Sequence, residues 1–462
     1  MPKSNNVNDG RFDETERPPQ LRCIDKYERF ALCRMSARYT VAFMAMMGFI
    51  ISFGMRGNFS LAKFMPPLEN VHWTVYEEWM MNFSFYWGYL LASISGGILA
   101  TVYPAYRIFG IAICISAILS MTIPGWVMLG NVVVLILIRF SLGLVEGVIL
   151  PACLGIWRFW SPPQERSRLP TIAFCGTFAG IMIGGPMYMA LVQRVSWQAP
   201  FYLYSMVGVF WYLAWLWLVF EKPQNHPTIS VEEKEYIEKS LGENTSTVTK
   251  SSIPFRRIVI SAPVYAIIVV NFCRSWFSYT VLIYQDLFMK GKFNYVVSSE
   301  GTALSYLIMT LSIPIGGILA DCLLKSGKMS TTNVRKLFTC GGFGAAFSGL
   351  AISGYIANHL DISPKYASIL MGLSNGIGSL AGFVSPTVTN YIIFWYPGID
   401  AMYAWPALFI IPAIVNVFGV IFYGIFASGE LQPWAGPRAD SRTIRNPNEG
   451  GCPTEGIALA RL

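Results

Sequence analysis

The chain has 462 residues, of which 54% are hydrophobic and only 13% are charged, and its formal net charge is +8. A water-soluble chain carries nearer a quarter charged residues, so this composition excludes an ordinary globular domain. The excess of Lys and Arg lies between long apolar runs. That pattern is typical of loops that stay on the cytoplasmic side of a membrane, and it requires no nucleic-acid partner.

Long apolar runs take up most of the sequence. An α-helix needs about 20 apolar residues to cross a hydrocarbon core of about 30 Å, and each run must be helical because lipid offers no partner for free backbone groups. We therefore predict an all-α polytopic membrane protein whose main partner is the lipid bilayer. The eleven runs lie near 39–64, 79–101, 106–127, 131–157, 170–192, 200–220, 262–288, 300–321, 335–357, 365–396 and 403–427.

The loops indicate how the chain is oriented. Residues 1–38 are polar and show no cleavable signal peptide, so the run that begins at Tyr39 is predicted to be the first spanning helix. Lys and Arg then recur in alternate connections, at 158–169, 221–257 and 322–336. This alternation places the N-terminus in the cytoplasm.

The segment 221–257 divides the chain into two halves. Ser230 and Glu233 form a capping box ahead of apolar residues, which predicts a short surface helix in this segment. Only five runs follow it, and the odd total places the C-terminal tail on the lumenal side, in conflict with the arginines of that tail. The predicted parts are a tail at 1–38, a six-helix bundle at 39–220, a cytoplasmic linker at 221–257, a second helix bundle at 258–427 that is one helix short, and a tail at 428–462.

An internal repeat supports two related halves. Gly96-Gly-Ile-Leu-Ala100 recurs identically as Gly316-Gly-Ile-Leu-Ala320, at an offset of 220 residues. Each copy closes the second run of its half, just before a connection on the same side. Parallel repeats related by an axis along the membrane normal are the architecture of major facilitator transporters, so we predict two bundles related by pseudo-twofold symmetry around a central site.

Four ionisable residues fall well inside apolar runs: Arg56, Arg139, Glu146 and Arg274. Each costs roughly 2.5–3.5 kcal/mol at a helix centre, which is tolerable where the groups face water or one another. Arg56 and Arg274 stand 218 residues apart, nearly the repeat offset, so they occupy equivalent helices. Two converging guanidiniums suit a dianion or a dicarboxylate. The alternative is that each arginine has a structural role only.

Arg139 and Glu146 lie seven residues apart and therefore on one helix face, with a rise of roughly 10 Å between them. Our hypothesis is that Glu146 is the proton-coupling or gating carboxylate and that Arg139 is its charge partner. A purely structural salt bridge is the alternative.

Other function classes lack support in the sequence. The three histidines, His72, His226 and His359, fall in predicted loops, and no His/Cys spacing fits a metal site. No glycine loop followed by Lys is present to hold ATP phosphates. No nucleophile and base pair is visible at a membrane face, so we expect neither an ATP-driven pump nor an enzyme.

These residues resemble a known family, the anion transporters that include vesicular glutamate transporters, sialin and sodium–phosphate cotransporters. The resemblance runs from about Arg38 to Trp434, and the stretch around Arg274 is similar to the vesicular glutamate branch. The stretches that carry it are Gly48–Arg56, Gly143–Gly147, Pro151–Cys153, Pro162–Arg168, Asn271–Trp276, Asn358–Asp361, Tyr366–Gly372 and Phe426–Glu430.

The resemblance implies a major facilitator fold and potential-driven uptake of L-glutamate into synaptic or other vesicles, with sodium-coupled phosphate transport as a further activity. It implies no cofactor, only coupling ions (H⁺, Cl⁻ and Na⁺), and a monomer in a vesicle, acidic-organelle or plasma membrane. Arg56 and Arg274 match the family's substrate clamp, and Arg139 and Glu146 match its other functional charges.

Two departures from the family pattern matter. Asn82 stands where glutamate transporters carry a coupling or gating His, and about one helix of sequence is absent between Phe343 and Gly354. Two alternatives therefore stay open. One is a transporter of another anion, such as sialate, urate or phosphate, by proton or sodium coupling. The other is a non-transporting receptor or scaffold derived from a transporter.

Overall fold

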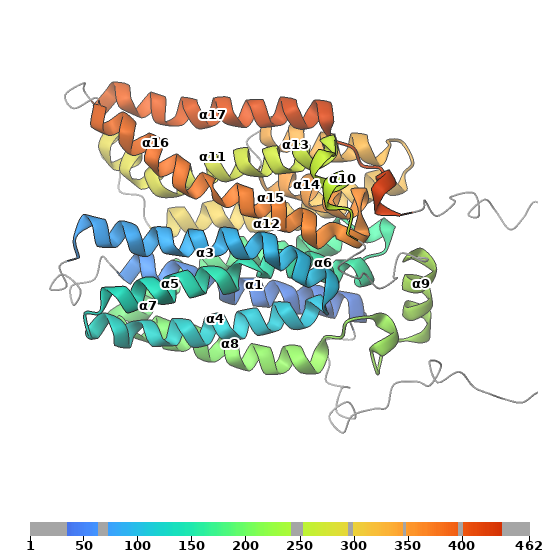
Figure 1. The fold of residues 1–462 in the computed structure, drawn as a ribbon, viewed down its shortest axis with the longest axis horizontal. Coiled ribbons are helices and arrows are strands. Elements are labelled where there is room, and N and C mark those ends of the chain that lie inside the picture. Colours follow the sequence, from blue (N-terminus) through green and yellow to red (C-terminus); the bar gives the residue numbers. More distant parts are fainter. Residues whose placement is uncertain are drawn as a thin grey trace, which may run out of the picture.

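The structure, a computed structural model, describes residues 35–62, 73–241, 253–293, 299–344, 348–395 and 401–436. All regular secondary structure in these ranges is helical, and the long helices run side by side (Figure 1). This confirms the predicted all-α fold. Within the same ranges, ten helical segments are long and apolar enough to cross a membrane.

The first half forms a bundle in which the six predicted runs appear as helices in the predicted order. The run at 131–157 is divided into two helices at Val148, shortly before Pro151, whose ring removes one backbone hydrogen bond. The helices are α1 (Ala37–Ala62), α3 (Val75–Val102), α4 (Ala105–Met128), α5 (Val132–Gly147), α6 (Ile149–Trp160), α7 (Arg168–Arg194) and α8 (Ala199–Leu218).

The linker contains the predicted surface helix, α9 (Val231–Leu241). Ser230 Oγ accepts a hydrogen bond from the Glu233 backbone N–H at 3.2 Å, which is one half of the capping box. The Glu233 carboxylate instead reaches α1, where it accepts from the backbone N–H groups of Ala37 at 2.9 Å and Arg38 at 3.2 Å. The linker helix thus caps the start of the first spanning helix, where a negative charge is favourable.

The second half begins with the short α10 (Phe255–Ile260) and ends with the apolar helix α17. Its helices are α11 (Ala262–Phe293), α12 (Ser299–Lys325), α13 (Thr331–Gly344), α14 (Ser348–Ile362), α15 (Ala367–Ser379), α16 (Ala381–Trp395) and α17 (Ala401–Phe426). Short 3₁₀ turns precede α7 and α15, at Pro163–Glu165 and Pro364–Tyr366.

The run predicted at 335–357 is not one spanning helix. It is divided between α13, with 14 residues, and α14, with 15. At 1.5 Å per residue each is about 21–22 Å long, too short for a core of about 30 Å. A Cβ on Gly342 would lie 2.5 Å from Ala351 N, and one on Gly354 would lie 2.8 Å from Thr339 N, so the two helices pack antiparallel as a hairpin.

The hairpin returns to the face at which it starts. Arg335 Nε, in the first turns of α13, donates to Asp361 at the end of α14 at 2.6 Å. The end of α17 lies there too, because Gly429 N donates to Thr332 Oγ1 at 2.9 Å and Gln432 N to Ile362 O at 3.0 Å. We call this the linker face, because α9 also lies on it (Figure 1).

This arrangement corrects the predicted topology. The hairpin adds no crossing, so the count of crossings in the described chain is even, and the expectation of a span at 335–357 is wrong. Arg38 at the start of α1 and Ser428 after α17 lie on the same face. The odd count had predicted opposite faces. The arginines of the C-terminal tail itself lie outside the described residues.

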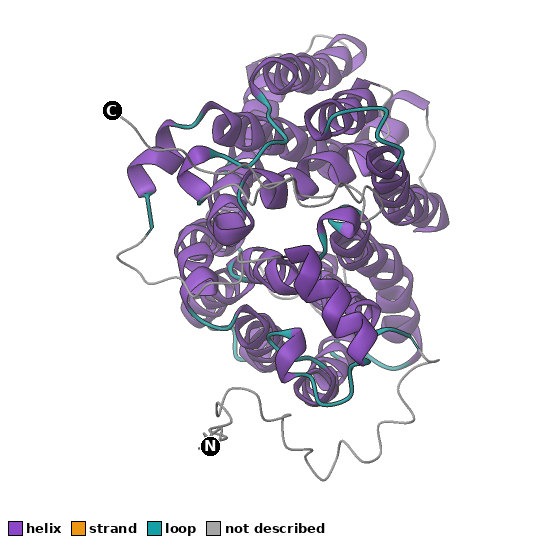
Figure 2. Cartoon of the chain, turned by 90° about the vertical axis from the view of Figure 1, so that its right-hand side faces the viewer, coloured by secondary structure: helices purple, strands orange, loops and turns teal. Residues whose placement is uncertain are grey.

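The two halves meet along two helix pairs. Seen from the linker face, the helices form two groups (Figure 2), and the sequence colours of Figure 1 show that one group comes from each half. Gly317 of α12 faces Ser167 and Arg168 at the start of α7, and Gly97 of α3 faces Ser368 and Ile369 at the start of α15. Both glycines belong to the repeated sequence, and the contacts give a physical reason for the repeat: a Cβ at either position would come within 3.0 Å of the backbone of the other half.

Candidate functional site

The four intramembrane charges lie on three helices, α1, α5 and α11. Arg56 and Glu146 form an ion pair, with Arg56 Nε at 2.8 Å and Nη2 at 2.7 Å from the same carboxylate oxygen. Glu146 is 2% exposed, whereas 26% of the Arg56 side chain remains accessible. A buried carboxylate requires such a partner, because an unpaired charge in this setting costs several kcal/mol.

Arg56 is thus the direct ion-pair partner of Glu146, which was not predicted, while Arg139 lies within electrostatic range of the same carboxylate, so its role as a charge partner stays a prediction. Arg139 and Glu146 lie on one face of α5 as predicted, but the rise along the helix separates them. Arg139 also stacks on aromatic rings, with its guanidinium carbon 4.5 Å from the Phe59 centroid and 4.9 Å from that of Phe85. Arg56 lies 5.2 Å from the same Phe85 ring, so that ring contacts two cations.

Arg274, on α11, is held by neutral groups. Its Nη2 lies 3.2 Å from Asn271 Oδ1 and 3.4 Å from Ser275 Oγ, and its guanidinium carbon lies 5.8 Å from the Tyr355 ring centroid. Within the described part of the chain, neither Arg274 nor Arg139 makes an ion pair. Three guanidiniums and one carboxylate leave this site with a positive charge that an anion can neutralise.

Tyrosines connect the charges of the two halves. Tyr279 lies within electrostatic range of both Arg56 and Arg274. Its ring is 5.8 Å from that of Tyr86 on α3. Asn375 on α15 donates to Tyr89 Oη at 2.9 Å, also on α3. These residues were not predicted from the sequence, because they carry no charge. One feature of the sequence indicates this aromatic group: Phe85 and Tyr89 stand four residues apart, so they share one face of α3, and both rings contact Arg56.

Asn82 and His359 lie on helices of different halves. Asn82 lies on α3, but its side chain is outside the described residues, so its role stays a prediction. His359 was predicted in a loop and instead lies in α14, fully buried. Its Nδ1 lies 2.8 Å from Tyr355 O and its Nε2 lies 2.9 Å from Ser374 Oγ. The helical hairpin brings this histidine inside the protein.

The comparisons with known proteins agree with this geometry. The sequence pattern of the Major Facilitator Superfamily matches residues 41–363. Vesicular glutamate transporter 1 of Bos taurus is 42% identical, across 92% of this chain and 81% of its own length. Human vesicular glutamate transporter 2 is also 42% identical, across 87% of this chain and 76% of its own length. The chain belongs to this family of major facilitator transporters.

The fold of this family member is shared with distant transporters. The crystal structure of the Escherichia coli fucose:proton symporter covers 85% of the chain with a TM-score of 0.59 at 12% identity. A bacterial homologue of the iron transporter ferroportin, in an outward-facing state, covers 83% with a TM-score of 0.55. These similarities confirm the predicted two-bundle fold, and the family assignment confirms the resemblance seen in the sequence.

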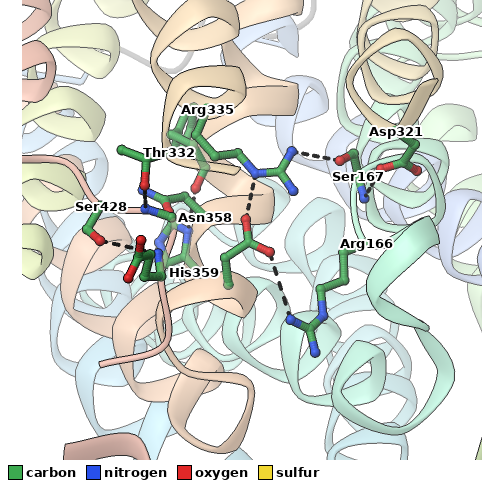
Figure 3. Close-up of polar contacts among 12 residues, drawn as sticks. Arg166, Ser167, Asp321, Thr332, Arg335, Asn358, His359 and Ser428 are labelled. Carbon is green, nitrogen blue, oxygen red and sulfur yellow. Dashed lines mark hydrogen bonds and ion pairs between the residues drawn. The ribbon is translucent and has the colours of Figure 1, made fainter. Parts of the chain in front are cut away.

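A second polar cluster of this transporter closes the linker face between the halves (Figure 3). Asp321 of α12 accepts from the backbone N–H groups of Ser167 at 3.1 Å and Arg168 at 2.9 Å. Arg335 is 1% exposed and donates to Asp361 at 2.6 Å and to Ser167 Oγ at 2.7 Å. The α13–α14 hairpin therefore holds the halves together on this face. These residues were not among the predicted sites, because they lie at the ends of apolar runs.

Proposed function

We propose that the chain is a secondary transporter that takes L-glutamate into vesicles, synaptic vesicles among them, driven by an inside-positive membrane potential. Two relatives at 42% identity are named as vesicular glutamate transporters. The chain has the central charges that such a substrate needs, and its spanning helices suit a multi-pass membrane protein.

The observation that carries this proposal is the placement of Arg56 and Arg274. They lie on α1 and α11, the first spanning helix of each half, with Tyr279 in electrostatic range of both. A guanidinium offers a planar fork of donors that matches a carboxylate. L-glutamate has two carboxylates, and two arginines on opposite helix groups would bind one each. A site shared by the halves is what alternating access requires.

Glu146 would then act as the gating carboxylate. While it holds Arg56, the guanidinium fork is occupied and the buried acid is neutralised. An arriving substrate carboxylate competes for Arg56, and protonation of Glu146 would weaken the pair and favour that exchange. Arg139 adds positive charge nearby. Proton and chloride coupling would act through this group, and Asn82 predicts a weaker response to pH or chloride than a histidine would give.

The placement in the membrane belongs to the same proposal. The linker face carries the basic connections and would be cytoplasmic, so that both tails lie in the cytoplasm. The chain would act as a monomer in the membrane of a vesicle or another acidic organelle.

The test is uptake of radiolabelled L-glutamate into proteoliposomes that contain the whole chain, under an imposed inside-positive potential. We expect potential-dependent uptake, and a fall of about tenfold or more for Arg274→Ala, because a charge-assisted pair to the substrate is lost. Arg107→Ala is the matched control, since Arg107 is an exposed arginine at the start of α4 that bonds only Tyr106 in the described structure. Equal uptake by the Arg274 and Arg107 variants would contradict the proposal that Arg56 and Arg274 bind the two carboxylates of the substrate.

A second candidate function is transport of another anion, because an arginine pair also matches phosphate. Phosphate with a sodium gradient, sialate and urate are therefore tested in the same proteoliposomes. Uptake of one of these without glutamate uptake would reassign the substrate. No uptake of any anion by correctly inserted protein would favour a non-transporting receptor or scaffold.

A further inference from the structure

The start of α15 is the counterpart of the start of α7. Each follows a 3₁₀ turn, at Pro163–Glu165 and at Pro364–Tyr366, and the two turns stand 201 positions apart. Each packs on the second glycine of the repeat. A Cβ on Gly317 would lie 3.0 Å from Ser167 O, and one on Gly97 would lie 2.6 Å from Ser368 O. The linker face therefore has two equivalent junctions between the halves.

The two junctions differ in one carboxylate. After Gly316-Gly-Ile-Leu-Ala320 comes Asp321, which accepts from the first backbone N–H groups of α7. After the matching copy comes Thr101, whose hydroxyl donates to Gly97 O in its own helix at 2.8 Å. At the start of α15, Ser363 Oγ accepts from the backbone N–H of Tyr366 at 3.3 Å. The second junction thus has hydroxyl groups in the described chain where the first one has the Asp321 carboxylate.

Positive side chains surround that place. A cavity of about 60 Å³ is lined by Thr101, Arg158, Glu221, Lys222, Lys365 and Ser368, among others. Arg158 is 7% exposed. Its guanidinium carbon lies 5.0 Å from the Phe159 ring centroid, and Lys222 Nζ lies 5.3 Å from the same centroid. Three cationic residues and one acidic residue thus line a space that holds roughly four waters, which is about the size of one tetrahedral oxyanion.

We propose that this cavity, beside Thr101, is a binding site for a phosphate group. Its charge of about +2 matches a phosphate monoester, which carries about −1.5 to −2 at pH 7. The oxygens of such a group would take the place that the Asp321 carboxylate has at the other junction, toward the α15 helix start. Inorganic phosphate and the headgroup of a phospholipid share this chemistry, and the cavity lies at a membrane boundary that both can reach. The site is separate from the central arginines and does not depend on the transported anion.

The experiment measures thermal unfolding of the whole chain in lipid nanodiscs. In one arm, inorganic phosphate is titrated into discs of phosphatidylcholine alone. In the other, the discs contain phosphatidic acid, with phosphatidylserine as the control for an anionic lipid without a phosphate monoester. We expect an increase of Tm in the first arm if the ligand is free phosphate, and only in the second if it is the lipid headgroup.

Variants assign the response to the cavity. Lys222→Gln with Lys365→Gln should weaken the apparent affinity about tenfold or more, since two charge-assisted contacts are lost. Thr101→Asp should abolish the response by supplying the carboxylate in place of the ligand. Lys239→Gln is the matched control, because Lys239 is an exposed lysine paired with Glu235 on the same face.

Three results would overturn the proposal. The first is no increase of Tm in either arm. The second is a response that the Lys222 and Lys365 substitutions leave unchanged. The third is a response that Arg274→Ala removes, which would assign the phosphate to the central site instead.

Discussion

In each half, the third and fourth helices form a pair that begins and ends on the linker face. The pair of the second half is much shorter than the pair of the first half. In the first half, α4 has 24 residues and α5 with α6 covers Val132–Trp160, and both are long and apolar enough to cross a membrane. In the second half, α13 and α14 have 14 and 15 residues and turn back half-way. The offset between matching positions falls from 220 at Gly96 and Gly316 to 201 at Ser167 and Ser368.

The difference teaches that a helix pair can be shortened without reversing the direction of the helices after it. The missing positions, about 19 by the change in offset, come from the inner ends of both helices, so the hairpin keeps its outer ends on the linker face. Those ends carry Arg335 and Asp361, which bind each other and the α6–α7 connection of the first half. Loss of one whole helix would have moved α15 and α17 into the opposite direction and separated these contacts.

The largest expected effect is on the side of the membrane from which single cysteines can be labelled, because labelling occurs from one side or the other. A cysteine at Ser428 and one at Lys239 should react with an impermeant maleimide from the same side of sealed proteoliposomes, in a background without the chain's own reactive cysteines. A cysteine at Leu129, which is 72% exposed after α4, should react from the other side. Reaction of positions 428 and 239 from opposite sides would show that α13 and α14 together cross the membrane once.

The next effect concerns the base of the hairpin. Arg335→Ala should lower the free energy of unfolding by about 3 kcal/mol, because the buried Asp361 loses its partner at 2.6 Å and keeps only Arg166 at 3.9 Å. Thermal unfolding in detergent measures it. Arg107→Ala, at the exposed start of the counterpart helix α4, should have little effect. The double variant Arg335→Met with Asp361→Leu should regain part of the stability, since it removes both charges of the 2.6 Å pair, and the cost that remains is that of Arg166, which loses Asp361 as its partner at 3.9 Å. A double variant as unstable as the single one would contradict this account.

Much of the fold could be predicted from the sequence, for physical reasons. Apolar run lengths, the repeat at Gly96 and Gly316, and the basic connections each constrain the chain through the bilayer, and the family assignment agrees with them. The hairpin could not be predicted because an apolar run of 23 residues at 335–357 satisfies the length rule for one span equally well. Only contacts such as that of Gly354 with Thr339 distinguish the two arrangements.

The site was predicted in its charges but not in its pairs. The free-energy cost of placing a charged side chain inside the bilayer is enough to single out Arg56, Arg139, Glu146 and Arg274 as candidate site residues. Which arginine forms the direct ion pair with Glu146 depends on how α1 packs against α5. The spacing of residues within one helix gives no information about contacts with a second helix. Proximity in sequence favoured Arg139, whereas tertiary packing brought Arg56 to the carboxylate.

The smallest expected effect is a difference in stability between alanine substitutions at two adjacent glycines of α13. A Cβ on Gly342 would lie 2.5 Å from Ala351 N, so Gly342→Ala should push the hairpin helices apart and cost about 1–3 kcal/mol. A Cβ on Gly341 would meet no atom within 4 Å in the described structure, so Gly341→Ala should be neutral or stabilise by about 0.5–1 kcal/mol through the helix preference of alanine. The difference in Tm between the two variants, measured in the same detergent, reports the close packing of α13 on α14. Equal values would mean that these helices do not touch, and that the shortened pair is held only at its linker-face ends.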